Sequence, residues 1–231
     1  MRLKRILAAL LTGAMLFLSG CGAHAAEVAQ TCAAIHVALT FDDGPHETLT
    51  PELLSGLAQR DVHATFFVIG DLAEQYPDLL REMAAAGHQI GNHSYDHAQL
   101  DKLSCWEAVQ DIEKCDTLLQ ELLGEGIYWV RPPYGSISKG ECASIAAPLV
   151  TWSVDPEDWK ILDSKKVVKA VENTICDGSI ILMHDQYPST VEATLQIIDD
   201  LQAQGVVFCT LEELFACHGI CPELGRIYRH A

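Results

Sequence analysis

Short β-rich runs alternate with longer helical patterns along most of the chain, and this alternation is the strongest constraint on its fold. Several runs are continuously apolar, which is typical of parallel strands covered on both faces. The seven strand candidates are His36–Phe41, Ala64–Ile69, Gln89–Gly91, Tyr128–Val130, Leu149–Val154, Ile180–Met183 and Val206–Cys209. No glycine-rich nucleotide-binding turn follows any of them. We therefore expect one α/β domain, folded as a distorted (β/α) barrel of about seven parallel strands.

Helix start signals lie between these runs. Ser104-Cys-Trp-Glu107 is a capping box ahead of a helix that should reach about Leu123, and Thr210-Leu-Glu-Glu213 is a second one. Thr50-Pro51 is expected to open another helix, and Asp78–Ala86 to form one that stops at the following glycine.

The N-terminus indicates export. Basic residues in 1–5 precede the apolar run Ile6–Leu18, which is shorter than the about 20 residues of a spanning helix. Leu18-Ser-Gly-Cys21 resembles the lipobox of bacterial lipoproteins, in which the cysteine is lipidated; signal cleavage near Ala23–Ala26 is the alternative. We expect a protein on the outer face of the cytoplasmic membrane, or a secreted one.

These features divide the chain into four parts. We expect a lipoprotein-type signal segment at 1–21, a short linker at 22–35, the main domain at 36–216 and a cysteine-containing tail at 217–231.

Charge excludes one class of partner. The formal net charge is −17, and such an acidic surface repels nucleic-acid phosphates and anionic lipid head groups. We expect no nucleic-acid binding, membrane contact only through the N-terminal lipid or signal segment, and a monomer.

The chain contains nine cysteines, and eight remain if Cys21 carries lipid. An even number in an exported protein favours disulfides, with buried free thiols as the alternative. Cys105 and Cys115 should not pair, because ten residues of helix place them about 15 Å apart. The cluster Cys209, Cys217, His218 and Cys221 lacks the paired C-x-x-C spacing of a zinc site.

Polar residues follow five strand candidates at the same end. Asp42-Asp43, Asn92-His93, Arg131, Asp155 and His184 each come directly after an apolar run. Because chemistry in barrels lies at the C-terminal ends of strands, these residues should meet in one site.

Two of these residues, together with His97, suit a metal ion. His93 and His97 are at i and i+4, a spacing that places both imidazoles on one face of a helical turn. Together with Asp43 they would form a site with three protein ligands and an open position for water. We expect one divalent ion, Zn²⁺, with Co²⁺, Mn²⁺ or Ni²⁺ as alternatives.

The remaining candidates would position or move protons. Arg131 could hold a carboxylate bidentately, and the Tyr134 N–H, in a loop fixed by two prolines, could serve as an oxyanion donor. His184 stands beside Asp185, a carboxylate that would raise its pKa. Trp152 and Trp159 suit either packing or stacking on sugar rings.

Five ordered motifs carry a resemblance to a known family. Between His36 and Leu214 the chain resembles the polysaccharide deacetylases, carbohydrate esterase family 4. The matching motifs are TFDDGP at 40–45, HSYDH at 93–97, RPPYG at 131–135, DPEDW at 155–159 and LMH at 182–184.

The resemblance implies a role for each motif residue. Asp43, His93 and His97 would bind the metal, and Asp42 would be the general base, positioned by Arg131. The Tyr134 backbone would assist the oxyanion, His184 would be the general acid and Asp158 would tune it. The acetyl pocket would be lined by Tyr134, Trp159, Leu182 and Trp152.

We therefore expect a metal-dependent hydrolase that removes N-acetyl groups from the amino sugars of a glycan, most simply peptidoglycan. The alternatives are a deacetylase of chitin-type oligosaccharides, an O-acetyl esterase on a polysaccharide, and an inactive glycan-binding protein of the same fold. The resemblance does not explain the cysteine content.

Overall fold

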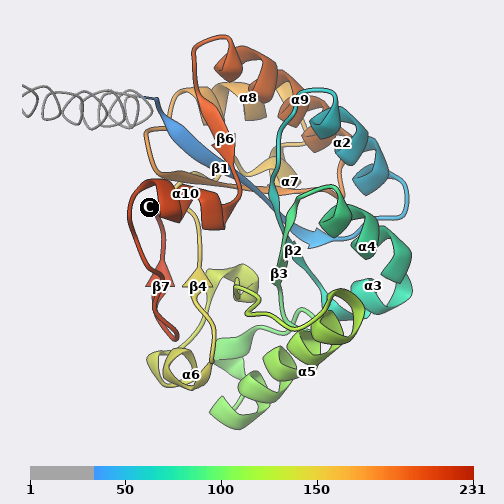
Figure 1. Cartoon of the computed structure of the whole chain (residues 1–231), viewed down its shortest axis with the longest axis vertical. Coiled ribbons are helices and arrows are strands. Elements are labelled where there is room, and N and C mark those ends of the chain that lie inside the picture. Colours follow the sequence, from blue (N-terminus) through green and yellow to red (C-terminus); the bar gives the residue numbers. More distant parts are fainter. Residues whose placement is uncertain (1–33) are drawn as a thin grey trace, which may run out of the picture. The chain divides into compact units, whose positions relative to one another are not determined.

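The computed structural model describes residues 34–231, and its centre is a parallel β-sheet (Figure 1). Four strands are paired in the order β3 (Gln89–Asn92), β2 (Thr65–Val68), β1 (His36–Gly44) and β5 (Ser179–His184). Strand β6 (Val207–Cys209) also pairs with β1, along its first residues. Every ladder is parallel.

Single bridges extend this sheet into a ring. Asn92 pairs with Val130, Val130 pairs with Leu149, and Val154 pairs with Ile181. The ring therefore runs from β1 through β2, β3, Val130 and the 149–154 segment back to β5 and β1. Strand β4 (Leu149–Val150) belongs to this segment and pairs with β7 (Ile227–Tyr228), a strand that the sequence did not predict. The expected α/β fold with parallel strands is confirmed, with regular ladders on one side and isolated bridges on the other.

Nine α-helices are assigned within residues 34–231. They are α2 (Leu49–Ala58), α3 (Gly70–Gln75), α4 (Pro77–Ala85), α5 (Cys105–Leu123), α6 (Lys139–Ser144), α7 (Asp158–Ile161), α8 (Ser164–Glu172), α9 (Pro188–Gln202) and α10 (Leu211–Cys217). Two 3₁₀ turns, η1 (Leu100–Lys102) and η2 (Pro133–Gly135), lie in the connections. Both expected capping boxes are present, at the starts of α5 and α10. Helix α2 begins earlier than expected, with Thr48 at its N-cap.

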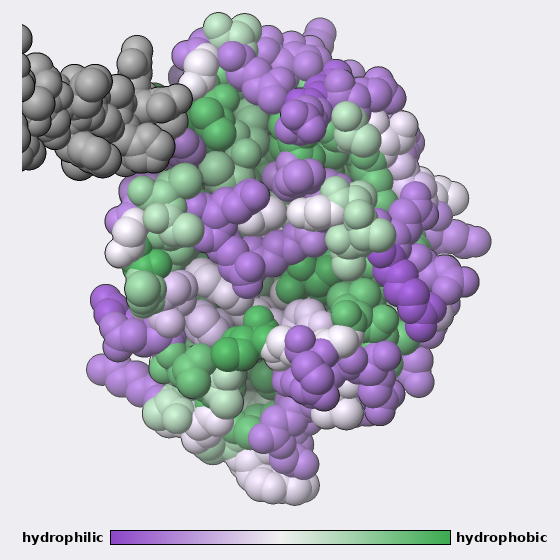
Figure 2. Space-filling model, in the orientation of Figure 1, coloured by the Kyte–Doolittle hydropathy of each residue, from purple (hydrophilic) through white to green (hydrophobic). Residues whose placement is uncertain are grey.

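Side-chain alternation along β1 divides the core into two layers. Val37, Leu39 and Phe41 pack in the cluster that the sheet shares with α2, α4 and α9. Ala38 faces the other way, into a cluster with residues of α10. Because side chains of a strand alternate, Thr40 and Asp42 lie on the same inner face as Ala38. On the face shown in Figure 2, hydrophilic residues occupy much of the edge and hydrophobic residues gather around a hollow near its centre.

The cysteines do not show the expected pairing. The seven cysteines between residues 34 and 231 are all free thiols, and Cys115, Cys142 and Cys209 are buried. These three behave as small apolar side chains within the hydrophobic clusters. Cys21, Cys32, the signal segment and nearly all of the linker lie outside the described residues. Among residues 34–231, none of the helices combines the length and hydrophobicity that a membrane span requires.

His88 is expected to make folding sensitive to mild acid. Its side chain is buried, its Nδ1 accepts a hydrogen bond from the Ala64 N–H, and burial lowers its pKa to about 4. The unfolded chain takes up this proton at about pH 6.5, so stability should fall as the pH drops from 6.5 towards 4. We expect urea unfolding of His88→Asn to be less pH-dependent than that of the wild type between pH 7 and 5. Equal slopes in both proteins would contradict this assignment.

Candidate active site

Strand register brings the predicted site residues together. In the β1–β5 ladder, Asp42 lies directly opposite His184, and in the β2–β3 ladder Val68 lies opposite Asn92, one residue before His93. A cavity of about 350 Å³ opens at these strand ends. Its lining consists of Asp42, Asp43, His93, His97, Tyr134, Trp152, Asp155, Trp159, Leu182, His184 and Tyr187. All predicted metal ligands and pocket residues line this one cavity.

Asp43, His93 and His97 form the one group with metal-ligating geometry among residues 34–231. Asp43 Oδ1 lies 3.3 Å from His93 Nε2 and 3.1 Å from His97 Nε2. The expected helical turn is wrong, because residues 93–99 form a loop without helix. Positive φ angles at Ser94 (66°) and His97 (59°) bring the second imidazole back to the first instead.

The donor set fits a divalent cation. His93 Nδ1 lies 2.7 Å from the carbonyl oxygen of Arg131, which can only accept, so Nδ1 carries the proton and Nε2 of the neutral ring offers a lone pair. Asp43 Oδ1 is buried without a hydrogen-bond donor. Lone pairs that converge in this way repel one another unless a cation lies between them.

Arg131 binds Asp42 from the interior of the ring of strands. The guanidinium is fully buried and lies over the Phe67 ring at 4.2 Å. Its Nη1 donates to Asp42 Oδ1 at 2.7 Å and to Thr40 Oγ1 at 2.8 Å, while Nη2 donates to the Thr151 carbonyl. The contact with Asp42 is therefore monodentate rather than bidentate as expected. Asp42 Oδ2 is left facing the cavity, 3.6 Å from His93 Nε2.

Asp158 holds and charges His184. Its Oδ1 accepts from His184 Nδ1 at 2.9 Å, and its Oδ2 accepts from the His184 N–H and from Thr190 Oγ1. Burial alone would lower the pKa of His184, but Asp158 raises it to about 9. The imidazole is therefore protonated at neutral pH. The neighbour Asp185 is not the partner expected from sequence, because its carboxylate binds Thr50 on the other side of the strand.

Aromatic side chains form the mouth of the cavity. Tyr134 lies in η2 with a positive φ of 59°, and its exposed ring contacts the His97 ring with centroids 4.8 Å apart. Gly135 has to be glycine, since a Cβ there would meet the Trp152 ring at 2.9 Å. Trp159 is half exposed, with 47% of its surface accessible. The cavity therefore has aromatic side chains on its wall beside the metal-ligating residues.

Sequence reasoning missed five residues that support or line the site. Thr40 and Thr190 bind Arg131 and Asp158, Gln186 Nε2 donates to the Asp43 carbonyl at 2.5 Å, Thr50 binds Asp185, and Tyr187 lines the cavity. Threonine and glutamine in apolar or helical segments carry no distinctive sequence signal. A prediction that β1 pairs with β5 would have placed Thr40 on the same face as Asp42, two residues before it.

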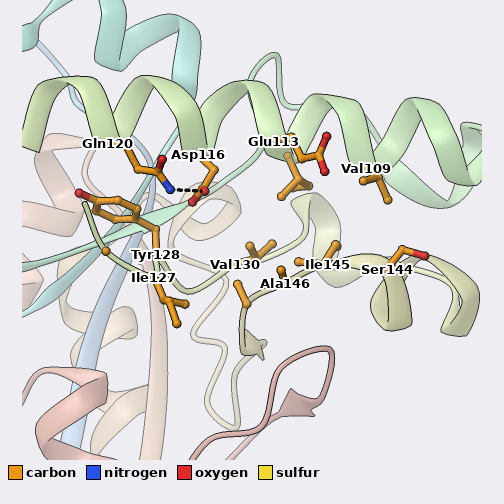
Figure 3. A pocket seen from close by; sticks show the side chains of 13 residues that line it. Val109, Glu113, Asp116, Gln120, Ile127, Tyr128, Val130, Ser144, Ile145 and Ala146 are labelled. Carbon is orange, nitrogen blue, oxygen red and sulfur yellow. Dashed lines mark hydrogen bonds between the residues drawn. The ribbon is translucent and has the colours of Figure 1, made fainter. Parts of the chain in front are cut away.

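A second cavity, of about 270 Å³, shares no residue with this site. Figure 3 shows it between one face of α5, with Glu113, Asp116 and Gln120, and the segments that carry Ile127, Val130 and Ile145. Gln120 Nε2 donates to Asp116 in this cavity. It has an apolar floor and no group with metal-ligating geometry.

Comparison with known proteins adds two kinds of match. The family model described as polysaccharide deacetylase matches residues 30–147. The chain is 39% identical over 192 residues to the peptidoglycan-N-acetylglucosamine deacetylase PgdA of Listeria monocytogenes. This match covers 83% of the chain. The chain spans 41% of that relative's length.

Solved structures agree with the sequence match. The peptidoglycan deacetylase PdaC of Bacillus subtilis superposes with a TM-score of 0.79 and 37% identity, covering 81% of this chain and 93% of that one. A family 4 acetyl xylan esterase of Clostridium thermocellum, solved with a cobalt ion, superposes with a TM-score of 0.80 and 33% identity. That match covers 85% of this chain and 98% of the other.

Metal binding by the triad can be measured directly. We expect the purified protein to bind one Zn²⁺, and His97→Ala to weaken that binding by at least about 100-fold, because two ligands hold the ion less firmly than three. Competition with a chromophoric chelator would give both affinities. His218→Ala is the matched control, since His218 pairs with Asp177 outside the cavity. Equal affinity of His97→Ala and wild type would refute the site.

Proposed function

The chain belongs to the polysaccharide deacetylase family, and on that basis we propose that it hydrolyses N-acetyl groups on the amino sugars of a glycan, with peptidoglycan as the substrate. One observation carries this proposal: a carboxylate held by a buried arginine and a protonated histidine held by a buried aspartate face the same cavity as a metal-ligating triad. Amide hydrolysis needs such a base and such an acid, because water must lose a proton and the nitrogen must gain one.

We propose the following division of work among the residues. Asp43, His93 and His97 hold the ion, which when bound polarises the acetyl carbonyl and makes water a stronger nucleophile. Asp42 accepts the proton of the attacking water through Oδ2, since Arg131 occupies Oδ1. The Tyr134 N–H donates to the oxygen on which negative charge develops.

His184 completes the reaction by proton donation. An unprotonated amide nitrogen is a poor leaving group, and the imidazolium beside Asp158 supplies the missing proton at Nε2. Leu182, Trp152 and Trp159 would surround the acetyl methyl group, with the exposed Tyr134 and Trp159 rings available to a sugar face.

The finer assignments complete the proposal. We propose Zn²⁺ as the resident metal, because two imidazoles and one carboxylate suit it, with Co²⁺, Mn²⁺ or Ni²⁺ as substitutes. We also propose that the protein is a monomer and is exported, either lipidated at Cys21 on the outer face of the cytoplasmic membrane or secreted. That location would give it access to peptidoglycan.

Acetate release tests the reaction. The domain from residue 22 onward should release acetate from insoluble peptidoglycan, lose this activity on chelation and recover it with Zn²⁺. Asp42→Asn should lower turnover by about 10²–10⁴-fold while the protein stays folded, because general base assistance typically contributes this factor. Asp61→Asn, at an exposed position, is the control.

Each other result selects an alternative. Release from chitin oligosaccharides alone would replace the substrate, and release from acetylated xylan alone would make the chain an O-acetyl esterase. Shortened glycan chains would identify a glycosidase. Metal binding without acetate from any substrate would leave an inactive glycan-binding protein.

The pH profile tests the role of His184. Its pKa of about 9 keeps the acid form present at neutral pH, so kcat/KM should fall as the pH rises above about 9. Asp158→Asn removes the carboxylate that raises this pKa, and the alkaline limb should move down by about one unit or more. Asp61→Asn should leave the limb in place. An alkaline limb that does not move in Asp158→Asn would remove His184 from the role of acid.

A further inference from the structure

Asp185 is a buried carboxylate that the mechanism does not use. It is fully buried, directly after β5, and burial raises its pKa to about 7. Alternation along β5 turns Asp185 away from the cavity that His184 faces, towards the apolar layer between the sheet and the helices. A carboxylate in such a layer is costly unless its contacts serve a purpose.

Those contacts lead to the end of β1 and to the start of α2, which follows it. Thr50 Oγ1, in the first turn of α2, donates to Asp185 Oδ2 and accepts from the His46 N–H at 2.7 Å. Asp185 Oδ1 has no hydrogen-bond donor and lies against the backbone of Gly44. A Cβ on Gly44 would lie 2.6 Å from that oxygen, so only glycine allows this approach.

The end of β1 also carries the metal ligand Asp43. Gln186 Nε2 donates to the Asp43 carbonyl at 2.5 Å, next to the Gly44 contact. Two consecutive residues after His184 therefore hold the backbone on both sides of the Asp43–Gly44 peptide. The β1–β2 ladder pairs Asp42 with Phe67 and Gly44 with Val68 but skips Asp43, so the ladder itself does not fix Asp43.

We propose that Asp185 and Thr50 form a clamp that positions Asp43 for metal binding and fixes it relative to His184. Asp185 is thus a positioning residue that acts through the Gly44 backbone and touches neither substrate nor metal. The inference rests on the proposed function for its effect on turnover, but its effect on metal affinity does not depend on that function. Outer residues that orient metal ligands typically contribute 10–100-fold to affinity or activity.

The first test removes one hydroxyl group. Thr50→Val keeps the shape of the side chain but breaks both hydrogen bonds, and should weaken Zn²⁺ binding by about 10–100-fold. The same variant should lower kcat more than it raises KM. Thr50→Ser restores the hydroxyl and should return both values to within about three-fold of wild type.

A matched control separates positioning from stability. Thr194 is also a fully buried threonine, and its Oγ1 donates to the Thr190 carbonyl within α9. Thr194→Val should lower the unfolding temperature to a similar extent as Thr50→Val, yet bind Zn²⁺ like the wild type. A folded Thr50→Val with wild-type Zn²⁺ affinity and kcat would overturn the proposal.

A second pair of variants tests the contact itself and serves if Thr50→Val does not fold. Gly44→Ala should weaken Zn²⁺ binding, because its methyl group collides with Asp185. Asp185→Ala removes the same contact and should weaken binding to a similar extent, and Gly44→Ala/Asp185→Ala should bind no more weakly than the weaker single variant. Wild-type affinity in Gly44→Ala or in Asp185→Ala, or fully additive losses in the double variant, would overturn the proposed contact.

The two proposals fail differently. If the wild type binds Zn²⁺ but releases no acetate, the proposed function fails, and the affinity of Thr50→Val still decides the clamp. If the wild type releases acetate and both Thr50→Val and Gly44→Ala match it in affinity and kcat, the clamp alone fails.

Discussion

The parallel pairing of β1 with β5 is the constraint on which the rest of the site depends. It places Asp42 directly opposite His184, so the groups that would accept and donate protons are fixed by backbone hydrogen bonds rather than by flexible loops. The same pairing places Thr40 opposite Leu182, below the catalytic pair. A shift of one residue in this ladder would turn Asp42 and Thr40 into the apolar layer under the helices. The register of this ladder therefore determines how Asp42 and His184 lie relative to each other.

Buried charges then set the protonation states. Arg131 has no exposed surface and keeps its proton, and it binds one oxygen of the Asp42 carboxylate while the other oxygen faces the cavity. Asp158 is equally buried and raises the pKa of His184 to about 9. Removing one partner of either pair would strongly destabilise the folded protein, because the other charge would remain buried without a partner. One cavity thus holds the Asp42 carboxylate and, at neutral pH, a protonated His184 imidazole.

The sequence predicted most of the site because its residues follow recognisable motifs at strand ends. It also predicted the parallel α/β architecture and both capping boxes. The helical turn at His93–His97 was wrong, since an i, i+4 spacing is also satisfied by a loop with two positive φ angles. The disulfides expected from an even cysteine count are not found between residues 34 and 231, where several cysteines are core residues. The β7 strand near the C-terminus follows no apolar run and could not be foreseen.

The partner of His184 shows why neighbours in sequence mislead in a strand. Asp185 is adjacent to His184, but consecutive side chains point to opposite faces, so proximity along the chain implies separation across the sheet. Asp158, 26 residues away, reaches the histidine instead, and Asp185 reaches α2. Two aspartates of one chain therefore serve the two faces of β5. The inner one raises the pKa of the imidazole, while the outer one contacts the backbone at the end of β1, next to Asp43. At the end of β5, the side chains of the inner face would take part in the reaction, and the side chain of the outer face contacts the backbone that positions them.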